Sequence, residues 1–535
     1  MDITASLSQL DYWVIGLYAA LTVGLGVWIG AKQKTADGYF LAGRRMRWPV
    51  IGASLFASNV SSTTLVGLTG AAYGAGISVY NYEWMAAIVL VVFAVFFLPA
   101  ILRSGVYTLP EFLERRYSSA ARTYFALLTL FLNIVVDTAG SLFAGAVIFK
   151  LIWPELAYWQ IIVVLAFAAG AYVIVGGLVA VMATDVLQGV ILVIASCVIA
   201  VSAFDAAGGW SYVMGAAPAE KLSLIRPLGD PDMPWLGLAL GVPVIGFYFW
   251  CTNQFMTQRV LAAKNEHEGR WGVLFAGLLK LPLLFVVVLP GAAALALYPD
   301  LDHADFAYPA LVFDLLPAGL LGLALAGFVA ALMSQIDSTL NSASTIVTMD
   351  FVRRWAPALT SLQLMRVGRG ATLVFMVLAV VWAPQIARFP SLFNYLQSVL
   401  AYAVGPVVAL FVVGVFSPRA NARGANAAIL VGVATAALLF ILNFNLFGAS
   451  SWGGGFKLHF LYVAPLVTGV SAAALILGSL SAPPPDADKT QGLIWSPSVF
   501  EEETRGLSAM PWWANYRIQS VSLIALTICV VIAWR

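Results

Sequence analysis

Long apolar runs follow one another along nearly the whole chain and are separated by short polar segments. A helix needs about 20 consecutive apolar residues to cross the hydrocarbon core of a bilayer. The chain contains about 14 such runs, of which the first covers residues 12–31 and the last residues 516–534. The closely spaced stretch 158–204 divides most naturally at Gly176 and Gly177. We therefore predict an all-α integral membrane protein with about 14 transmembrane helices.

The composition supports this prediction and excludes other classes of protein. Of the 535 residues, 61% are hydrophobic and 10% are charged, whereas a soluble domain is about half apolar and about a quarter charged. Such a chain cannot cover a water-facing surface, which excludes a large soluble enzyme, and its 13% aromatic content excludes a disordered chain. The net charge of +2 gives no reason to expect a nucleic-acid partner. The lipid bilayer is the partner that this composition demands.

The sequence contains no motif of a soluble enzyme. It has no P-loop, no HExxH and no GxSxG elbow. Its three cysteines, Cys197, Cys251 and Cys529, lie apart in apolar runs and form neither a disulfide framework nor a CxxC cluster. We therefore predict a protein that is not an enzyme. Since an ATP site is missing, any uphill transport would have to use an ion gradient.

The basic residues predict an orientation in the membrane. Lysine and arginine fall mainly in every second loop between the runs. Because cytoplasmic loops are enriched in these residues, both termini are expected outside, in a multi-pass protein of the cell (inner) membrane. The first run follows Asp2 and Asp11 rather than basic residues, so we do not expect a signal peptide. The Pro-rich segment 481–515 is expected to be a solvated cytoplasmic linker.

Five charged residues interrupt the apolar runs: Glu83, Asp137, Asp185, Lys280 and Asp337. A charge inside a membrane is costly and usually faces a cavity or a partner. Glu83 and Asp185 lie near the ends of their runs, where a side chain can also reach water. Asp137, Lys280 and Asp337 are too deep for that. For these three, the alternative to a functional role is a structural ion pair.

Small polar residues form two clusters at mid-depth. The first is residues 57–64, Ala-Ser-Asn-Val-Ser-Ser-Thr-Thr, where a weakened helix would leave carbonyl oxygens free to bind a cation. In the second, Ser334, Asp337 and Ser338 share one helical face with Ala331. Hydroxyl and carboxylate oxygens suit an alkali or alkaline-earth ion rather than zinc. The alternative is a helix-packing surface of small residues.

Eight stretches of the sequence resemble the sodium/solute symporter family, and within it the sodium–glucose and sodium–galactose cotransporter branch. In order, between residues 38 and 425, they are GASLFASNVSSTTLVGLTG, YNYEW, YTLPEFLERRY, ATDVLQG, QRVLAAKN, LLKLP, DSTLNSASTIVTMD and FNYLQSVLAYAVGP. The resemblance implies a LeuT-like core of two inverted five-helix repeats, with substrate and ion near mid-membrane beside the broken first helix of each repeat. In the second repeat, the aromatic residues 247–250 and the polar residues 252–254 would form that break.

This resemblance divides the chain into five parts. They are an extra N-terminal span and cytoplasmic loop (1–49), the first inverted repeat (50–204), an external loop (205–234), the second inverted repeat (235–416), and three C-terminal spans with a cytoplasmic Pro-rich loop (417–535).

The resemblance also implies a sodium (Na+) site. Its ligands would be the carbonyl oxygens of Ala57, Val60 and Ala331 and the side chain of Ser334. Gln335 stands where the sugar transporters carry a second serine; its amide oxygen can ligate sodium, but its longer side chain can also point elsewhere. Some relatives hold a second cation, and the residues at those positions are Asp185, Asp337 and Ser338.

For the substrate, the resemblance implies a pocket for a neutral sugar or polyol. A polyol offers many donors and acceptors, which carboxylate, ammonium and amide groups together can satisfy. The implied substrate-binding residues are Asn59, Thr64, Glu83, Lys280, Gln397 and Trp250. The implied gates are Leu68, Tyr82 and Phe393 on the outer side and Phe249 on the inner side. Glu83 and Lys280 would also neutralise one another.

Several positions depart from the family pattern. Thr64 replaces Gln or His, Gly246 replaces Asn or Thr, and Phe249 replaces a gating Tyr, while Asp137 is an acid in place of Asn or Lys. The first three changes, together with Ala86 in place of a small polar residue, remove hydrogen-bonding groups and enlarge the pocket, whereas Asp137 can recruit a new donor. The identity of the sugar is therefore left open. We predict a sodium-coupled symporter for a neutral sugar or polyol. The alternatives are a symporter for sialic acid or another small carboxylate, a sugar facilitator or sensor that does not concentrate its ligand, and proton coupling through Asp337 or Asp185.

Overall fold

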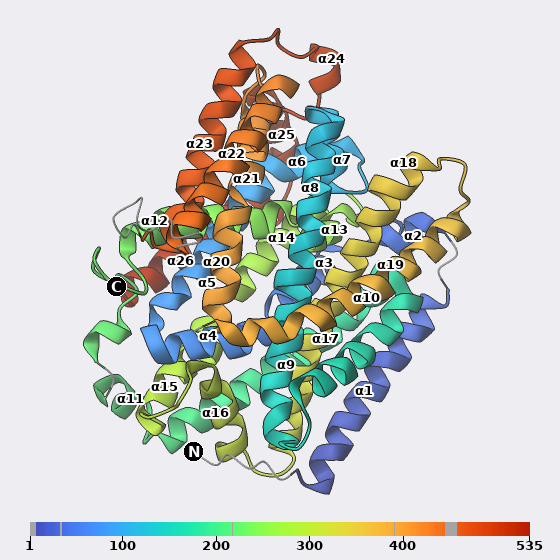
Figure 1. The fold of residues 1–535 in the computed structure, drawn as a ribbon. Helices are drawn as coiled ribbons and strands as arrows, with labels where there is room; N and C mark the ends of the chain where they lie inside the picture. Colours follow the sequence, from blue (N-terminus) through green and yellow to red (C-terminus); the bar gives the residue numbers. More distant parts are fainter. Residues whose placement is uncertain (1–6, 33–34, 217, 390, 445–456) are drawn as a thin grey trace.

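The structure is a computed structural model, and it describes residues 7–32, 35–216, 218–389, 391–444 and 457–535, with the side chains of 171–176, 487 and 499 left aside. Throughout these residues the regular elements are helices, as Figure 1 shows. A single isolated β-bridge between Met46 and Ala263 is the only β-type pairing within the described ranges. The predicted all-α class is therefore confirmed.

The helices of the first half are α1 (Gln9–Gly30), α2 (Ala36–Leu41), α3 (Trp48–Asn59), α4 (Ser62–Ala75), α5 (Asn81–Val92), α6 (Leu98–Ser104), α7 (Leu109–Arg116), α8 (Ser119–Leu132), α9 (Ala139–Ile152), α10 (Tyr158–Ala206) and α11 (Trp210–Ala216). The second half contains α12 (Trp235–Phe247), α13 (Gln254–Leu261), α14 (Glu266–Lys280), α15 (Leu289–Leu297), α16 (Ala307–Leu315), α17 (Leu320–Ile346), α18 (Arg353–Trp355), α19 (Ser361–Trp382), α20 (Leu392–Ala403), α21 (Gly405–Phe416), α22 (Ala422–Asn443), α23 (Phe460–Leu480), α24 (Ala487–Thr490), α25 (Pro497–Ser508) and α26 (Tyr516–Ala533).

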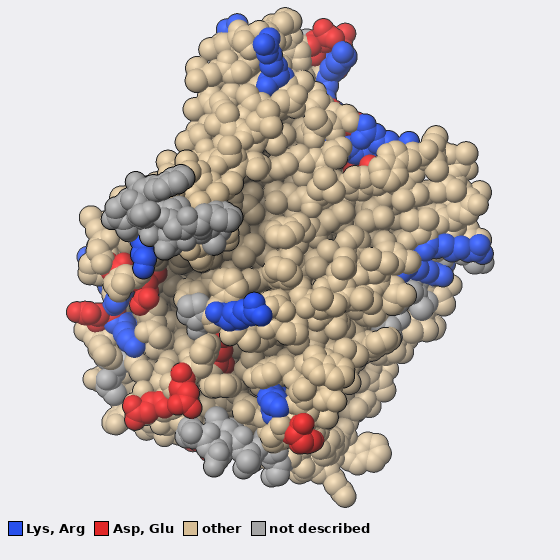
Figure 2. All heavy atoms as spheres, in the orientation of Figure 1, with Lys and Arg blue, Asp and Glu red and all other residues tan. Residues whose placement is uncertain are grey.

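Eleven helical segments in the described residues are long and apolar enough to cross a membrane. Two bent pairs, α3 with α4 and α20 with α21, raise this number to 13 if each pair is one span. The shorter apolar helix Tyr158–Gly170 coincides with a further predicted run. The count of about 14 spans depends on this short helix and stays a prediction. Figure 2 shows that most of the visible surface is uncharged, as a lipid-facing surface requires.

The helix over the first polar cluster is broken, as its small polar residues predict. α3 ends at Asn59, α4 begins at Ser62, and the two axes differ by 56°. In a continuous helix the Ser61 N–H would bond to the Ala57 carbonyl, but here it donates to the Asn59 carbonyl at 2.9 Å. The break therefore releases the Ala57 carbonyl from its helical partner. Val60 lies at the break with non-helical backbone angles.

Two further interruptions were also visible in the sequence. α12 continues through a π-helical turn, Tyr248–Thr252, and ends at Asn253, whose extended backbone separates it from α13. α10 is interrupted at Gly177, which has φ 61° and ψ −168°. This region of backbone space is open essentially to glycine only. A Cβ at Gly177 would also lie 2.5 Å from the Tyr39 carbonyl oxygen, so the division at this position is confirmed.

α17 is the central helix of the molecule. It packs against α10, α1, α19 and α3 and is buried along most of its length, including its polar residues from Ser334 to Thr345. α10 crosses it and in turn packs against α3. The second polar cluster therefore lies in the protein interior rather than against lipid. This arrangement brings the two clusters predicted from the sequence close together, since Ser58 and Ser334 hydroxyls are 3.2 Å apart.

The structure excludes one alternative about exposure and corrects one expectation. Glu83 is 7% exposed and Asp185 is 0% exposed, so neither side chain reaches water from a helix end. The segment 481–515 is not simply a solvated linker, because α25 is tied to the helical core. Its Glu503 carboxylate accepts hydrogen bonds from Arg270 of α14 at 2.7 Å and from the Tyr516 hydroxyl of α26 at 2.9 Å. The Pro-rich composition of this segment does not reveal that an acid of α25 can bind a basic residue of the helical core.

Replacing Gly177 with alanine is expected to destabilise the protein by about 1–3 kcal/mol, because the backbone angles and the close approach of Tyr39 both exclude a side chain. The measurement is the apparent melting temperature of the purified protein in detergent. Gly24→Ala in α1, where a Cβ would meet no atom within 4 Å, is the matched control and should melt with the parent. Equal melting temperatures for all three proteins would contradict the assigned strain.

Candidate functional site

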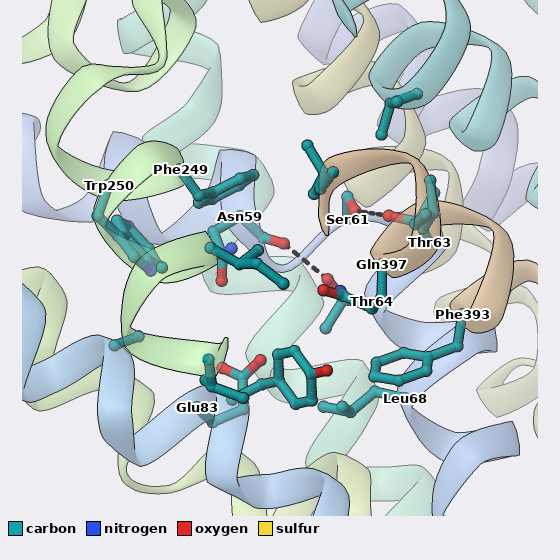
Figure 3. Close-up of a pocket in the computed structure, with 18 of the residues that line it drawn as sticks. Asn59, Ser61, Thr63, Thr64, Leu68, Glu83, Phe249, Trp250, Phe393 and Gln397 are labelled. Carbon is teal, nitrogen blue, oxygen red and sulfur yellow. Dashed lines mark hydrogen bonds between the residues drawn. The ribbon is translucent and has the colours of Figure 1, made fainter. Parts of the chain in front are cut away.

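A cavity of about 130 Å³ lies beside the break between α3 and α4. Figure 3 shows side chains from α4, α5, the end of α12 and α20 pointing into it. All six predicted substrate-binding residues and all four predicted gate residues line this cavity: Asn59, Thr64, Glu83, Lys280, Gln397, Trp250, Leu68, Tyr82, Phe393 and Phe249. Side chains that are up to 338 positions apart in the chain are therefore brought together at one site, which is what the resemblance implied for them.

Lys280 is the charged centre of the cavity wall. Its ammonium pairs with the Glu83 carboxylate of α5 and donates to the Asn59 side-chain oxygen. It also lies 5.4 Å from the centre of the Trp250 ring, a cation–π distance. Lys280 is 1% exposed, so this paired arrangement offsets the cost of burying its charge. The expected neutralisation of Lys280 by Glu83 is confirmed.

Asp137 and Gln335 form a second polar wall. Asp137 lines the cavity, and its side chain hydrogen-bonds to Asn253 and Gln335 rather than to Lys280. The Gln335 Oε1 accepts a hydrogen bond from the Ser141 hydroxyl at 2.5 Å and from the Thr63 hydroxyl at 3.3 Å. Gln335 thus reaches the cavity and α9, and its amide oxygen is already engaged there.

The Tyr82 and Phe393 rings close one side of the cavity. They meet edge to face, with ring centroids 5.2 Å apart, and Figure 3 shows Leu68 beside Phe393. Two polar atoms near these rings, the Tyr82 hydroxyl and the Gln397 Oε1, are buried and have no hydrogen-bond partner among the described residues. A buried acceptor without a partner costs about 1–3 kcal/mol. These two atoms therefore carry hydrogen-bonding capacity that the described residues do not use.

Ser334 lies on α17 next to the helix break. Its hydroxyl donates to Asp185 Oδ1 at 2.5 Å and lies 3.2 Å from the Ser58 hydroxyl. Ala57, Val60, Ala331 and Ser334 are all essentially buried, at 0–1% exposure. The structure thus places a released carbonyl, at Ala57, and a serine hydroxyl in one buried region, the kind of oxygen environment that an alkali ion requires.

The sequence reasoning missed the role of Arg259. It was assigned to a cytoplasmic loop, but it is fully buried in α13. Its guanidinium lies 2.9 Å from Asp185 Oδ2, its Nε donates to the Ser54 hydroxyl at 2.7 Å, and it also donates to Ser338. The available signal was that Arg259 lies within QRVLAAKN, one of the stretches that resemble the family. Nothing in the hydropathy pattern separates a buried arginine from a loop arginine.

The predicted second cation position is therefore occupied by a side-chain cation. Asp185 and Ser338 both contact Arg259, whereas Asp337 is buried on a neighbouring part of the α17 surface. Groups of three or more His, Cys, Asp or Glu residues that could hold a metal ion are not found in the described ranges. Any cation bound here would share Asp185 with the guanidinium.

Comparison with known proteins gives a family and two close relatives. The model described as "Sodium:solute symporter family" matches residues 39–432. Sodium/glucose cotransporter 4 of Danio rerio is 34% identical over 95% of this chain and 84% of the relative. Sodium/myo-inositol cotransporter 2 of Oryctolagus cuniculus is 34% identical over 92% of this chain and 79% of the relative.

A solved structure gives the fold. The substrate-bound outward-open state of a Na+-coupled sialic acid symporter is similar with a TM-score of 0.76, covering 90% of this chain and 99% of that chain. The two sequences are 22% identical, so this likeness concerns the fold alone. It confirms the LeuT-like architecture that the resemblance implied.

Replacing one member of the Lys280–Glu83 pair is expected to destabilise the protein more, per substitution, than replacing both. Glu83→Gln or Lys280→Gln alone leaves the other charge buried without its counter-ion and should lower stability by about 3 kcal/mol. The double variant should lose clearly less than the sum of the two, measured as thermal unfolding in detergent. Asp486→Asn is the control, because its partner Lys489 is 75% exposed, and it should change nothing. Additive losses would show that the two charges are not coupled.

Proposed function

This chain belongs to the sodium:solute symporter family, and we propose that it is a multi-pass membrane transporter that imports a neutral sugar or polyol together with Na+. The relatives named above are a sodium/glucose and a sodium/myo-inositol cotransporter, which places sugars and polyols first among the candidate substrates. Uphill import would be driven by the sodium gradient, with both ligands favouring the same conformations of the protein.

One observation carries the choice of a neutral substrate. The lysine in the cavity, Lys280, already pairs with Glu83, so it is not free to bind a carboxylate. Among the residues that the structure describes, no arginine lines the cavity. Apart from this pair and the acid Asp137, the polar side chains that line the cavity are uncharged: Asn59, Ser61, Thr63, Thr64, Tyr82, Gln335 and Gln397. A sugar hydroxyl can donate to the Gln397 oxygen, and the ring can lie on Trp250 or Phe249.

For sodium we propose the site at the helix break. Its ligands are the carbonyl oxygens of Ala57, Val60 and Ala331 and the hydroxyl of Ser334. The carbonyl released at Ala57 and the neighbouring carboxylate of Asp185 support this assignment. Gln335 remains a candidate fifth ligand by position, but its amide oxygen already accepts from Ser141 and Thr63. We therefore assign Gln335 to the wall of the substrate cavity.

A second cation at Asp185, Asp337 and Ser338 is proposed only for a state in which Arg259 has moved. The Arg259 guanidinium would have to move away from Asp185, because two positive charges cannot share one buried carboxylate at contact distance without strong repulsion. In the arrangement of the structure, Arg259 supplies the positive charge at this position. Coupling to a single sodium ion is the simpler outcome.

The gates and the orientation complete the proposal. Leu68, Tyr82 and Phe393 would form the outer gate and Phe249 the inner aromatic floor, so that the cavity opens alternately to each side. Both termini would face the outside of the cell (inner) membrane. The five-part division predicted from the sequence, with inverted repeats at 50–204 and 235–416, fits the helix breaks at residues 60 and 253.

Uptake into proteoliposomes tests the function directly. With Na+ outside and none inside, a radiolabelled neutral sugar or polyol from a panel of glucose, galactose, inositol and N-acetylglucosamine should accumulate, and with K+ in place of Na+ it should not. Lys280→Ala should abolish accumulation, because it removes the centre of the cavity wall. The panel also contains sialic acid.

Other results would favour the alternatives. Accumulation of sialic acid alone would favour a carboxylate symporter, and equilibration without any sodium dependence would favour a facilitator or sensor. Accumulation driven by an imposed pH gradient without Na+ would favour proton coupling through Asp185 or Asp337.

Two neighbouring residues of α17 are expected to separate the ion site from the substrate cavity. Ser334→Ala should raise the half-saturating Na+ concentration by about tenfold, because it removes an ion ligand. Gln335→Ala should raise the half-saturating sugar concentration and leave the sodium dependence nearly unchanged. Both are read from initial uptake rates at varied Na+ and varied sugar. A shift in sodium dependence of equal size in both variants would instead make Gln335 a sodium ligand.

A further inference from the structure

A short turn on the proposed outer side lies between α4 and the first turn of α20, the helix that carries Phe393. The turn is η8 (Ala304–Phe306), which follows α15 and precedes α16. It lies so close to α4 that a Cβ at Gly70 would be 2.7 Å from the Ala304 carbonyl oxygen. Tyr73, at the end of α4, donates to the Tyr298 carbonyl at 2.8 Å and pins the segment that leads into the turn. The turn is therefore fixed on the outer half of the broken helix.

Asp305 connects this turn to α20. Its Oδ2 accepts a hydrogen bond from the Leu392 N–H at 3.0 Å, in the first turn of α20. The first N–H groups of a helix have no partner within the helix, and a negative charge is favoured there by the helix dipole. The Ser391 hydroxyl accepts from the Asn394 N–H at 3.1 Å, so the carboxylate and the serine cap different groups. Asp305 acts as a second cap supplied from another element.

The helix that Asp305 holds carries two residues of the cavity. Phe393 follows directly after Leu392, and Gln397 lies one turn further along. Phe393 meets the Tyr82 ring, and its Cβ is 3.7 Å from the position of a Cβ at Gly67 on α4. The turn, the outer half of the broken helix and the start of α20 thus form one connected unit over the cavity.

The Asp305 side chain is buried, unlike the side chain of a helix cap at the protein surface. Its residue exposure is 3%, and its second carboxylate oxygen, Oδ1, is buried without a hydrogen-bond partner among the described residues. The His303 Nδ1 lies 3.6 Å from Oδ2 and accepts from the Asp305 N–H, so the imidazole is not a donor to the carboxylate in this arrangement. The carboxylate is held mainly by the helix end.

We propose that Asp305 is a positioning residue of the outer gate: its carboxylate holds the first turn of α20, and with it Phe393, closed over the cavity. This inference rests on the proposed transport function only in assigning Tyr82 and Phe393 as a gate. Removing the charge would weaken the closed arrangement, so the cavity would be open to the outside for a larger fraction of time.

The same geometry makes the gate sensitive to external pH. Burial raises the pKa of the Asp305 carboxyl above its ordinary value of 3.8, although the Leu392 N–H and His303 oppose this rise. The contact that opening would break is the Leu392 N–H, which lowers this pKa, so the pKa is higher when α20 moves away and the turn stays packed on α4. Protonation as the external pH falls therefore favours the open gate. The closed gate is therefore favoured above the pKa and weakened below it.

Other titratable groups near Asp305 are few. The preceding segment carries Asp300, Asp302 and His303. The elements packed against Asp305 carry Tyr73 on α4, Tyr308 and Asp314 on α16, and Tyr395 and Tyr402 on α20. Tyrosines are neutral in the relevant pH range. Asp314 accepts a hydrogen bond from the Tyr298 hydroxyl at 2.7 Å, away from the helix end. The contribution of His303 to the pH response therefore has to be distinguished from that of Asp305 by mutation.

The test uses access to the cavity rather than transport. Ala86 lines the cavity and is 3% exposed, so Ala86→Cys reports on gate opening when a membrane-impermeant thiol reagent is added outside. Cys197 and Cys529, which are exposed, are replaced by serine, and buried Cys251 is kept. In this background Asp305→Asn should increase the labelling rate roughly fivefold at neutral pH, since it removes the negative charge from the helix end although the amide oxygen can still accept from the Leu392 N–H.

The pH dependence distinguishes the carboxylate from its neighbours. The parent should label faster as the external pH is lowered from about 8 to about 5, and Asp305→Asn should be fast and flat over this range. Asp302→Asn, an exposed acid three residues away, and His303→Gln should keep the parent profile, and Asp305→Glu should keep the slow labelling at neutral pH.

Two results would overturn the inference. One is unchanged labelling in Asp305→Asn at neutral pH, and the other is a pH response that survives in Asp305→Asn but disappears in His303→Gln. Sugar uptake by the same proteins is measured separately. Labelling that follows Asp305 without any sodium-driven uptake would reject the proposed transport function and leave the gate inference standing.

Discussion

A lysine buried at mid-membrane depth is the constraint around which the site is organised. Lys280 can remain charged there only because Glu83, Asn59 and Trp250 surround its ammonium. Glu83 comes from α5, Asn59 from the last turn of α3 and Trp250 from the end of α12. The single ammonium therefore fixes three helices at one point, and one of them is the helix that breaks one residue later. The position of the cavity follows from this requirement.

A second buried ion pair lies beside the proposed ion site and likewise neutralises a buried cation with a carboxylate. Arg259 of α13 meets Asp185 of α10, with Ser54 and Ser338 completing the contacts of the guanidinium. In both pairs the acid comes from the first half of the chain and the base from the second. Each pair thus connects the two halves across the interior. Because a buried pair is costly to separate, these links restrict how the halves can move relative to one another.

The sequence was sufficient for most of the fold, for identifiable reasons. Apolar runs report directly on burial in lipid, so the helices and the breaks at residues 60, 177 and 253 could be placed in advance. The cavity residues could be predicted as well, because the resemblance supplied the long-range proximity that periodicity cannot give. Arg259 could not be placed, since it lies between two long apolar runs, as loop arginines do, and its partner lies 74 positions away. The packing of α25 was missed for a similar reason. Glu503 binds Arg103 and Arg270, which lie more than 200 positions away in the chain.

The polar side chains of the cavity favour a ligand that carries several hydroxyl groups. The Gln397 Oε1 can only accept a hydrogen bond, whereas the Tyr82 hydroxyl can donate or accept. A ligand with adjacent hydroxyl groups satisfies both atoms, because each hydroxyl is donor and acceptor at once. A carboxylate has no donor for Gln397 and would meet the Glu83 and Asp137 carboxyl groups without a free cation to compensate. Phe249 carries no hydroxyl group and offers no such hydrogen bond. Polar contacts to a ligand are therefore available from α4, α5, α17 and α20, and the Phe249 side of the cavity offers an aromatic surface instead.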